Sequence, residues 1–189
     1  MEENYLANAR KQFLYYKTLG DRSFAQLSDK DLFWQYNPES NSIAITVNHM
    51  WGNMLSRWTD FLTSDGEKTW RKRDLEFEDV IKTRTELDEK WEEGWACLFK
   101  ALDSINAGNF QQKVYIRNQA HSIVEAVDRQ LAHYAYHVGQ IVYIGRMLKG
   151  ADWQSLSIPK GKSKDFNKKK FAKKDESGHF TDEFVDKSE

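Results

Sequence analysis

The sequence predicts an all-α protein built as a single bundle of helices. Four long segments carry apolar residues three and four positions apart, the spacing that places them on one face of a helix. Only two prolines occur, which is few for an all-β protein, and seven Trp, eight Tyr and eleven Phe suit extensive aromatic packing between helices. A chain of 189 residues is long enough to form one domain with a full core.

The first helix is predicted from about Glu3 to about Leu19, because this segment holds apolar residues at helical spacing. Those residues are Leu6, Ala9, Phe13 and Tyr16. Gly20 is expected to end the helix, since glycine is common just past a helix C-terminus. A short helical turn is predicted at Ser28–Asp31, whose residues can form a capping box, and Pro38 indicates a loop.

The second helix is predicted to begin after an N-cap at Asn41 or Ser42 and to end near Leu62. Its apolar face consists of Ile43, Val47, Met50, Met54, Trp58 and Phe61. His49 lies off this face, on a polar sector of the helix. Taken by itself, a histidine in such a place is more often a solvated surface residue than a ligand.

A charged linker is expected over Thr63–Asp79, and a capping box at Thr83–Glu86 then begins a third helix, predicted over 84–105. The apolar face of this helix consists of Leu87, Trp91, Trp95, Leu98, Leu102 and Ile105. Gly94 lies inside it, where glycine costs about 1 kcal/mol relative to alanine. The sequence therefore indicates that another helix approaches closely at Gly94.

The fourth helix is predicted over 120–149, after an extended segment at Lys113–Arg117. Its core face consists of Ile123, Val127, Leu131, Tyr134, Val138, Ile141 and Val142. His133 and His137 are four residues apart, so they lie one turn apart at the edge of that core face.

Two imidazoles at this spacing can bind one divalent ion if a third ligand, such as His49, comes from another helix. The alternative is a pair of partly buried histidines that are bonded to neighbouring polar groups. The residue after His133 is Tyr134, so the pair lacks the glutamate of the zinc-protease motif. His121 projects from the opposite side of the predicted helix and is not expected to be a ligand.

Three amide side chains on the same polar sectors, those of Asn53, Gln130 and Gln140, are candidates for supporting the ligands or orienting a substrate. Three neutral imidazoles leave an open position on a divalent ion, as in catalytic zinc sites. A thiol or a water molecule entering that position would lose its proton more readily, so thiol chemistry and hydrolysis both stay open. Imidazole ligands suit zinc and nickel alike.

The formal net charge of −1 gives no field that would favour a strongly charged partner. One cysteine, Cys97, excludes an internal disulfide, suits a reducing compartment and falls on an apolar stripe, where a core role is expected. No apolar run approaches the roughly 18 residues of a membrane-spanning helix, and the first residues, Met1–Asn4, are acidic and polar. A cytoplasmic protein without a membrane partner is therefore expected.

The composition changes near the C-terminus, so residues 1–165 are assigned to the helical domain and 166–189 to a charged, flexible tail. Lys160–Lys174 holds eight lysines and one acid, too little apolar surface to become ordered by itself. The alternative is an arm that contacts anions or nucleic acid. Nucleic acid is not an expected partner, because the domain is not basic and carries no recognised motif.

Three segments carry a more specific pattern. They are SIAITVNHMWGNMLSRW at 42–58 followed by Asp65-Gly66-Glu67, RQLAHYAYHVGQ at 129–140, and SLSIPKG at 155–161. These segments resemble one branch of the DinB/YfiT-like superfamily of metal-dependent enzymes, a branch catalogued as a domain of unknown function. The resemblance covers nearly the whole chain up to about residue 165.

The resemblance implies an up-down-down-up four-helix bundle with a divalent-metal site, whose ligands correspond to His49, His133 and His137. Some members of the superfamily use a low-molecular-weight thiol as co-substrate, so a thiol-dependent S-transferase acting on a small molecule is the favoured function. The alternatives are a non-catalytic metal-binding or stress-response bundle and a metal-dependent hydrolase. The resemblance and the aromatic content together favour a homodimer.

Overall fold

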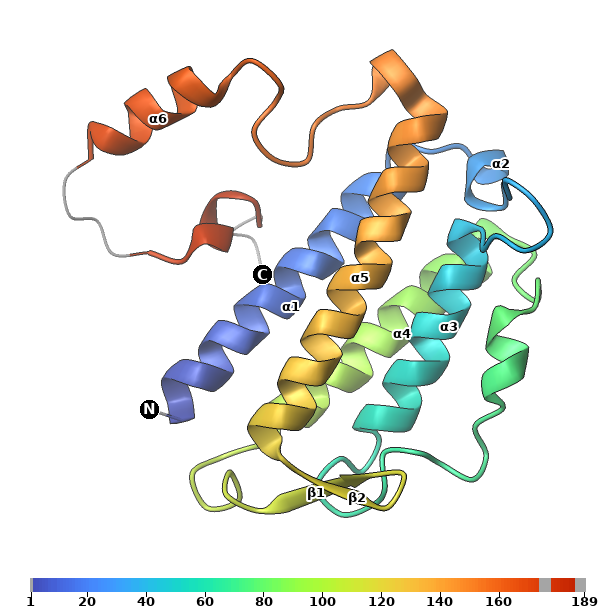
Figure 1. The fold of residues 1–189 in the computed structure, drawn as a ribbon, viewed down its shortest axis with the longest axis vertical. Coiled ribbons are helices and arrows are strands. Elements are labelled where there is room, and N and C mark those ends of the chain that lie inside the picture. The colour runs from blue at the N-terminus through green and yellow to red at the C-terminus, as the bar shows by residue number, and fades with distance from the viewer. Residues whose placement is uncertain (1, 174–177, 186–189) are drawn as a thin grey trace.

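The computed structural model describes residues 2–173 and 178–185 and is mostly helical, as an all-α fold requires (Figure 1). Its elements in chain order are α1 (Glu2–Phe24), α2 (Asp29–Leu32), α3 (Ile43–Trp58), the 3-10 helix η1 (Arg73–Phe77), α4 (Arg84–Asp103), β1 (Lys113–Ile116), β2 (Gln119–Ser122), α5 (Ile123–Lys149), the 3-10 helix η2 (Gly150–Asp152), α6 (Ser163–Phe171) and the 3-10 helix η3 (Phe180–Glu183).

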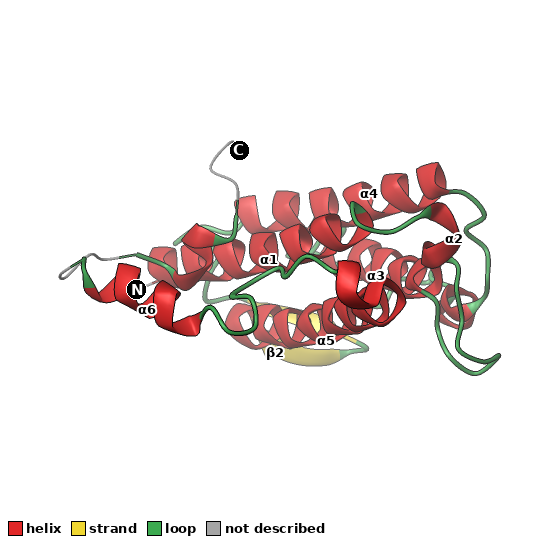
Figure 2. Cartoon of the chain, turned by 90° about the horizontal axis from the view of Figure 1, so that it is seen from above, coloured by secondary structure: helices red, strands yellow, loops and turns green. Residues whose placement is uncertain are grey.

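The four long helices lie alongside one another and enclose the core (Figures 1 and 2). Helix α3 packs along α4 and α1 along α5, with further contacts between α3 and α5 and between α1 and α4. The apolar faces expected for the second, third and fourth helices all supply core residues. Buried aromatic rings meet edge to face between helices, as where Phe13 contacts Trp58 and Trp95.

The expectation that Gly20 ends the first helix is wrong, because α1 continues to Phe24. Gly20 is buried inside the helix, and a Cβ built there would overlap the indole ring of Trp91 on α4. The glycine therefore lets two helices approach closely instead of terminating one. Gly94 on α4 has the role expected of it, since a Cβ there would lie 2.9 Å from the Met54 sulfur and 3.4 Å from the Trp51 Cα, both on α3.

The helix starts agree closely with the sequence. Ser42 caps α3 through its side chain, and capping boxes at Ser28 and Thr83 begin α2 and α4. The fourth long helix begins three residues later than expected, at Ile123, because residues 119–122 form a strand. That strand, β2, pairs antiparallel with β1, and the hairpin crosses the lower end of the helices in Figure 1.

The segment expected to be a charged linker is structured where it passes α3. Its 3-10 helix η1 packs against α3 and buries the side chain of Glu76. Trp70, in the same segment, stays about half exposed. The composition of this segment indicates a solvated linker, but in the structure the segment places the carboxylate of Glu76 against α3.

The C-terminal residues include α6, whose side chains are not buried, and a segment around η3 that contacts α1. Lys11 forms an ion pair with Asp182 at 2.8 Å, and Tyr15 packs edge to face on Phe180. The predicted flexibility of residues 166–189 stays a prediction, and 174–177 and 186–189 lie outside the described residues. Within the described ranges, no helix combines the length and the apolar character needed to cross a membrane.

Candidate metal centre

Three histidines from two helices converge beside the core. His49 projects from α3, and His133 and His137 project from successive turns of α5. The Nε2 atom of His133 lies 3.0 Å from Nε2 of His137 and 3.3 Å from Nε2 of His49. The three candidate ligand atoms all lie within 4.8 Å of one another, so the structure brings together the three residues that the sequence singled out.

The outer ring nitrogens of two of these histidines are fixed by acceptors. His49 Nδ1 lies 2.9 Å from the Glu76 carboxylate, and His137 Nδ1 lies 2.8 Å from the amide oxygen of Gln140. A carboxylate and an amide oxygen only accept, so each Nδ1 carries the proton and each Nε2 presents a lone pair inward. His133 Nε2 can donate to one of these neighbours but not to both.

This arrangement fits a cation. Nitrogens about 2.0–2.1 Å from a tetrahedral zinc ion lie roughly 3.3 Å from one another. The Nε2 separations of 3.0 and 3.3 Å are close to that value. A shared ion would satisfy lone pairs that otherwise face one another in a largely buried place.

The electrostatic environment keeps two of the imidazoles neutral. Burial, the neighbouring histidines and the charges of Arg57 and Arg71 lower the pKa of His133 to about 3. Burial also lowers the pKa of His137 to about 4, against the opposing effect of its hydrogen bond to Gln140. Neutral imidazole is the form that binds a metal, so both side chains are competent ligands near neutral pH.

Glu76 is the partner of His49 that the sequence did not reveal. Its carboxylate accepts from Arg71 Nε at 2.7 Å and Arg71 Nη2 at 2.9 Å, while it also bonds His49. Burial acts to raise the pKa of Glu76, but the bonds from Arg71 and His49 outweigh it and hold the pKa below the ordinary value. The surface position expected for His49 taken by itself is wrong, because η1 covers it and leaves it only 4% exposed.

The three candidate amides take different places. Gln140 bonds His137, as described above. Asn53 is buried and accepts a hydrogen bond of 3.0 Å from the Tyr134 hydroxyl, which itself accepts from Trp58 Nε1. Gln130 is also buried, and its amide oxygen has no hydrogen-bond partner among the described residues. His121, excluded as a ligand, lies on β2 and bonds the Gln119 carbonyl.

A cavity of about 270 Å³ opens beside the histidines. Its lining residues are His49, Asn53, Arg57, Arg71, Arg73, Arg117, Arg129, Gln130 and His133. Two of the three histidines and two of the three candidate amides thus face the same space. The five arginines come from five separate segments, namely α3, the loop before η1, η1 itself, the β1–β2 turn and α5, which is why spacing along the chain did not group them.

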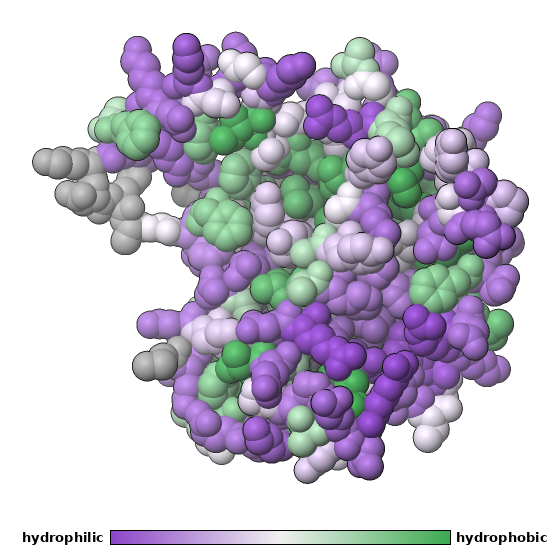
Figure 3. Space-filling model, in the orientation of Figure 1, coloured by the Kyte–Doolittle hydropathy of each residue, from purple (hydrophilic) through white to green (hydrophobic). Residues whose placement is uncertain are grey.

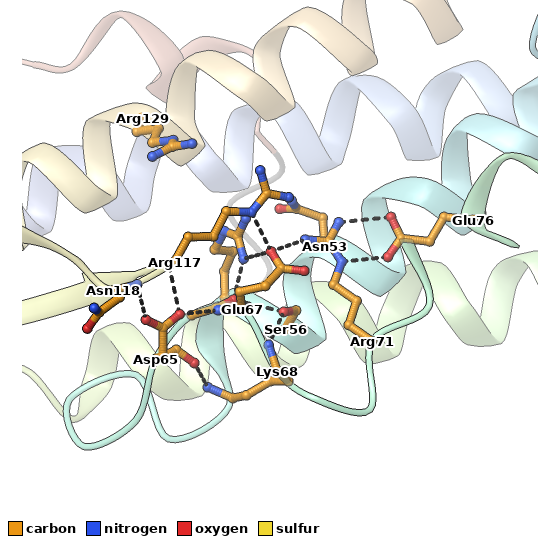
Figure 4. A network of polar contacts seen from close by, with 12 residues as sticks. Asn53, Ser56, Asp65, Glu67, Lys68, Arg71, Glu76, Arg117, Asn118 and Arg129 are labelled. Carbon is orange, nitrogen blue, oxygen red and sulfur yellow. Dashed lines mark hydrogen bonds and ion pairs between the residues drawn. The ribbon is translucent and has the colours of Figure 1, made fainter. Parts of the chain in front are cut away.

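Three of the five arginines share the carboxylate of Glu67, which lies within the polar network of Figure 4. One oxygen of the Glu67 carboxylate lies 3.1 Å from Arg57, 3.2 Å from Arg71 and 3.3 Å from Arg117. The side chains of Arg57 and Arg71 are 6% and 2% exposed, whereas that of Arg117 is 58% exposed. Two of these guanidinium groups therefore belong to the interior, and the third can reach into solvent.

A neighbouring carboxylate, that of Asp65, fixes the turn of the β1–β2 hairpin. It accepts from the backbone N–H groups of Arg117 at 2.8 Å and Asn118 at 2.7 Å. Both residues have positive φ, 54° and 60°, the left-handed conformation that a tight hairpin requires. The Asp65-Gly66-Glu67 segment quoted from the sequence thus joins the hairpin to α3 and holds Arg117 at the cavity.

Comparison with known proteins identifies the chain at the level of a family. Searches among curated proteins and among solved structures found no match. A family model described as "Protein of unknown function (DUF1572)" matches residues 1–162, which include both histidine-bearing helices and the arginine-lined cavity. The chain therefore belongs to the DUF1572 family.

Proposed function

We propose that this protein is a divalent-metal-dependent enzyme in which His49, His133 and His137 hold the ion. One observation carries the proposal: three Nε2 atoms converge at 3.0 and 3.3 Å, and two of the rings have Nδ1 committed to an acceptor. Such outer bonds fix the tautomer and ring orientation of metal-binding histidines. Zinc and nickel are the ions proposed, since both accept imidazole ligands.

The residues around the proposed ion would have three different roles. A divalent ion on three neutral imidazoles would keep a position open and lower the pKa of a thiol or water entering it. Glu76 and Gln140 hold the rings of His49 and His137, and the cavity lined by His49 and His133 gives a substrate access. Asn53 and Gln130 line the same cavity and can orient what enters.

The reaction that we favour is transfer of a low-molecular-weight thiol to a small electrophile. The resemblance of the two histidine segments to the DinB/YfiT-like superfamily supports it, and we propose that the chain is a divergent member of that superfamily. The course of the long helices in Figure 1, with α1 and α5 running one way and α3 and α4 the other, supports an up-down-down-up bundle.

Elemental analysis of the purified protein tests the metal site first. We expect about one zinc or nickel ion per chain, and loss of it in His133→Ala and in His49→Ala, with helicity kept because apolar faces and not the ion supply the core. His121→Ala is the matched control, since it removes an imidazole outside the cluster. Metal content that survives replacement of both His133 and His137 would place the ion elsewhere.

Thiol chemistry is tested on the cobalt-substituted protein. A thiol that binds at the open position should change the visible spectrum, and an electrophile added with a panel of cellular thiols should then be turned over only in the presence of metal. A normal metal load with no spectral response to any thiol would reject the S-transferase. Ester hydrolysis in place of thiol transfer would favour the hydrolase, and loading without any turnover would favour a non-catalytic metal-binding protein.

The homodimer proposal rests on exposed aromatic residues. Tyr136 and Tyr143 on α5 are 62% and 65% exposed, and Met147 near them is 47% exposed. Tyrosine and methionine are enriched at protein interfaces. Sedimentation at micromolar concentration that gave only a 22.3 kDa species would reject the dimer.

A further inference from the structure

The cavity beside the histidines has far more positive charge than metal binding requires. Among the described residues that line it are five arginines and no carboxylate. In Figure 3, hydrophilic side chains gather on the lower half of the face shown, over the lower parts of α5 and α3. Like charges so close together repel one another, so their gathering calls for either internal compensation or an external anion.

Internal carboxylates account for only part of this charge. Glu67 serves three guanidinium groups with one oxygen, and Glu76 is occupied by Arg71 and His49. The Asp65 carboxylate accepts backbone N–H groups instead, and Asp74 is fully exposed at 3.8 Å from Arg73. These two carboxylates therefore serve Arg57, Arg71 and Arg117, and only Arg71 contacts both of them.

A buried donor at the cavity also lacks a partner. The Arg57 side chain is 6% exposed; its Nη1 donates to the Gly66 carbonyl, but its Nε has no hydrogen-bond partner among the described residues. Burial and the neighbouring Arg71 charge lower the pKa of Arg57, against the opposing effect of Glu67. An unpaired buried donor of this kind is costly unless something binds to it.

Three of the arginines are exposed and approach from separate elements. Arg73 comes from η1, Arg117 from the hairpin turn and Arg129 from α5. The backbone N–H of Arg117 donates to the Asp65 carboxylate, which sets the position of Arg117, while the contact found for Arg129 is a 3.5 Å one with His121. In Figure 4, Arg129 stands apart from the network of dashed lines that includes Arg71, Arg117 and Glu67. Guanidinium groups in this arrangement can close on an oxyanion from several sides.

We propose that this cavity binds a compact oxyanionic group of the substrate, a carboxylate or a phosphate. Arg117 and Arg129 would bind the group directly, and the positive charge of the buried Arg57 would add to its attraction. The anionic group would then lie beside His49 and His133, with the reacting part of the molecule directed toward the three Nε2 atoms. The inference names a substrate class for the proposed function. Anion binding itself rests on the arginines and does not require that function to be correct.

The test is calorimetric titration of the full-length protein, purified with its metal, with inorganic phosphate and separately with succinate. Dimethyl succinate is the uncharged comparison. We expect the wild-type protein to bind at least one of the two anions and not the ester, and Arg117→Gln and Arg129→Gln each to weaken binding about tenfold. The matched control is Arg146→Gln, an exposed arginine near the end of the same helix as Arg129, which should bind as the wild type does.

The outcomes separate the two proposals. A wild-type protein that contains its metal but binds neither anion would overturn the inference and leave the proposed function standing. Equal weakening by Arg146→Gln would also overturn it, because general charge attraction would then explain the binding. Anion binding that persists in metal-free His133→Ala, and is lost on Arg117→Gln, would support the inference even if the metal-dependent reaction were rejected. The preferred anion distinguishes a carboxylate substrate from a phosphorylated one.

Discussion

Gly52 on α3 faces the Glu76 carboxylate and tests whether that carboxylate sets the geometry of the centre. A Cβ built at Gly52 lies 2.6 Å from Glu76 Oε1 and 2.8 Å from its Cδ. To reach the 3.4 Å of an ordinary contact, the carboxylate must retreat by about 0.8 Å in a Gly52→Ala variant. The side chain cannot move at little cost, because it is buried and held from two sides.

A displacement of that size affects both partners of Glu76. Its bonds to His49 and Arg71 measure 2.9 Å and 2.7 Å, and hydrogen bonds weaken well before an added 0.8 Å. Loss of such an outer partner costs a ligating histidine about 10–100-fold in metal affinity. Since the bond is stretched and not removed, we expect about a tenfold loss, near the lower end of that range.

The assay is competition for metal against a chromophoric chelator at neutral pH, with circular dichroism as the measure of folding. The matched control is Gly139→Ala on α5, where an added Cβ meets nothing within 4 Å. Both substitutions remove a helical glycine and so gain about 0.5–1 kcal/mol of helix stability. Only Gly52→Ala should lose metal affinity. A folded Gly52→Ala protein that binds metal as tightly as the wild type would refute the role given to Glu76.

Three further predictions follow from the same structure. Glu76→Gln should lower metal affinity about 10–100-fold, because one amide oxygen cannot serve both of the carboxylate's partners, while Glu78→Gln nearby should not; the same chelator competition measures both. In the metal-free protein, the pKa values of about 3 for His133 and about 4 for His137 lie below the 6.5 of a free histidine, so the unfolded state takes up protons first. The free energy of unfolding should thus have its full value above pH 6.5. As the pH falls from 6.5, it should decrease by up to about 1 kcal/mol per pH unit for each histidine, as urea titrations at several pH values would show. Gly20→Ala should lower the melting temperature despite its helix propensity, because the added methyl overlaps a buried indole ring.

The long helices could be predicted because their information is local. An apolar face repeats every three to four residues, and a side-chain cap acts within three residues of itself, so both are visible in a short window. The starts at Ser42 and Thr83 were therefore predicted closely. Gly20 was misjudged because the same residue type serves a helix end and a close helix crossing, and only the position of Trp91 distinguishes them.

The three histidines also differ in whether local sequence could place them. His133 and His137 share one face of one helix, so their spacing predicts that they are neighbours. The position of His49 beside them depends on how α3 packs against α5. The burial of His49 depends on η1, and no periodic pattern in the sequence predicts that element. The resemblance to a known superfamily supplied that third residue; composition and spacing only permitted it.

The sequence by itself determined the helical class, the apolar faces and the paired imidazoles of α5, because these depend on contacts between residues close together in the chain. Only the tertiary structure decided that Glu76 reaches His49 and that five arginines surround one cavity. Contacts such as that between Glu76 and His49, 27 residues apart, form when separate elements pack, and their charges carry no periodic signal along the chain. The surroundings of the three histidines are therefore a property of the packing.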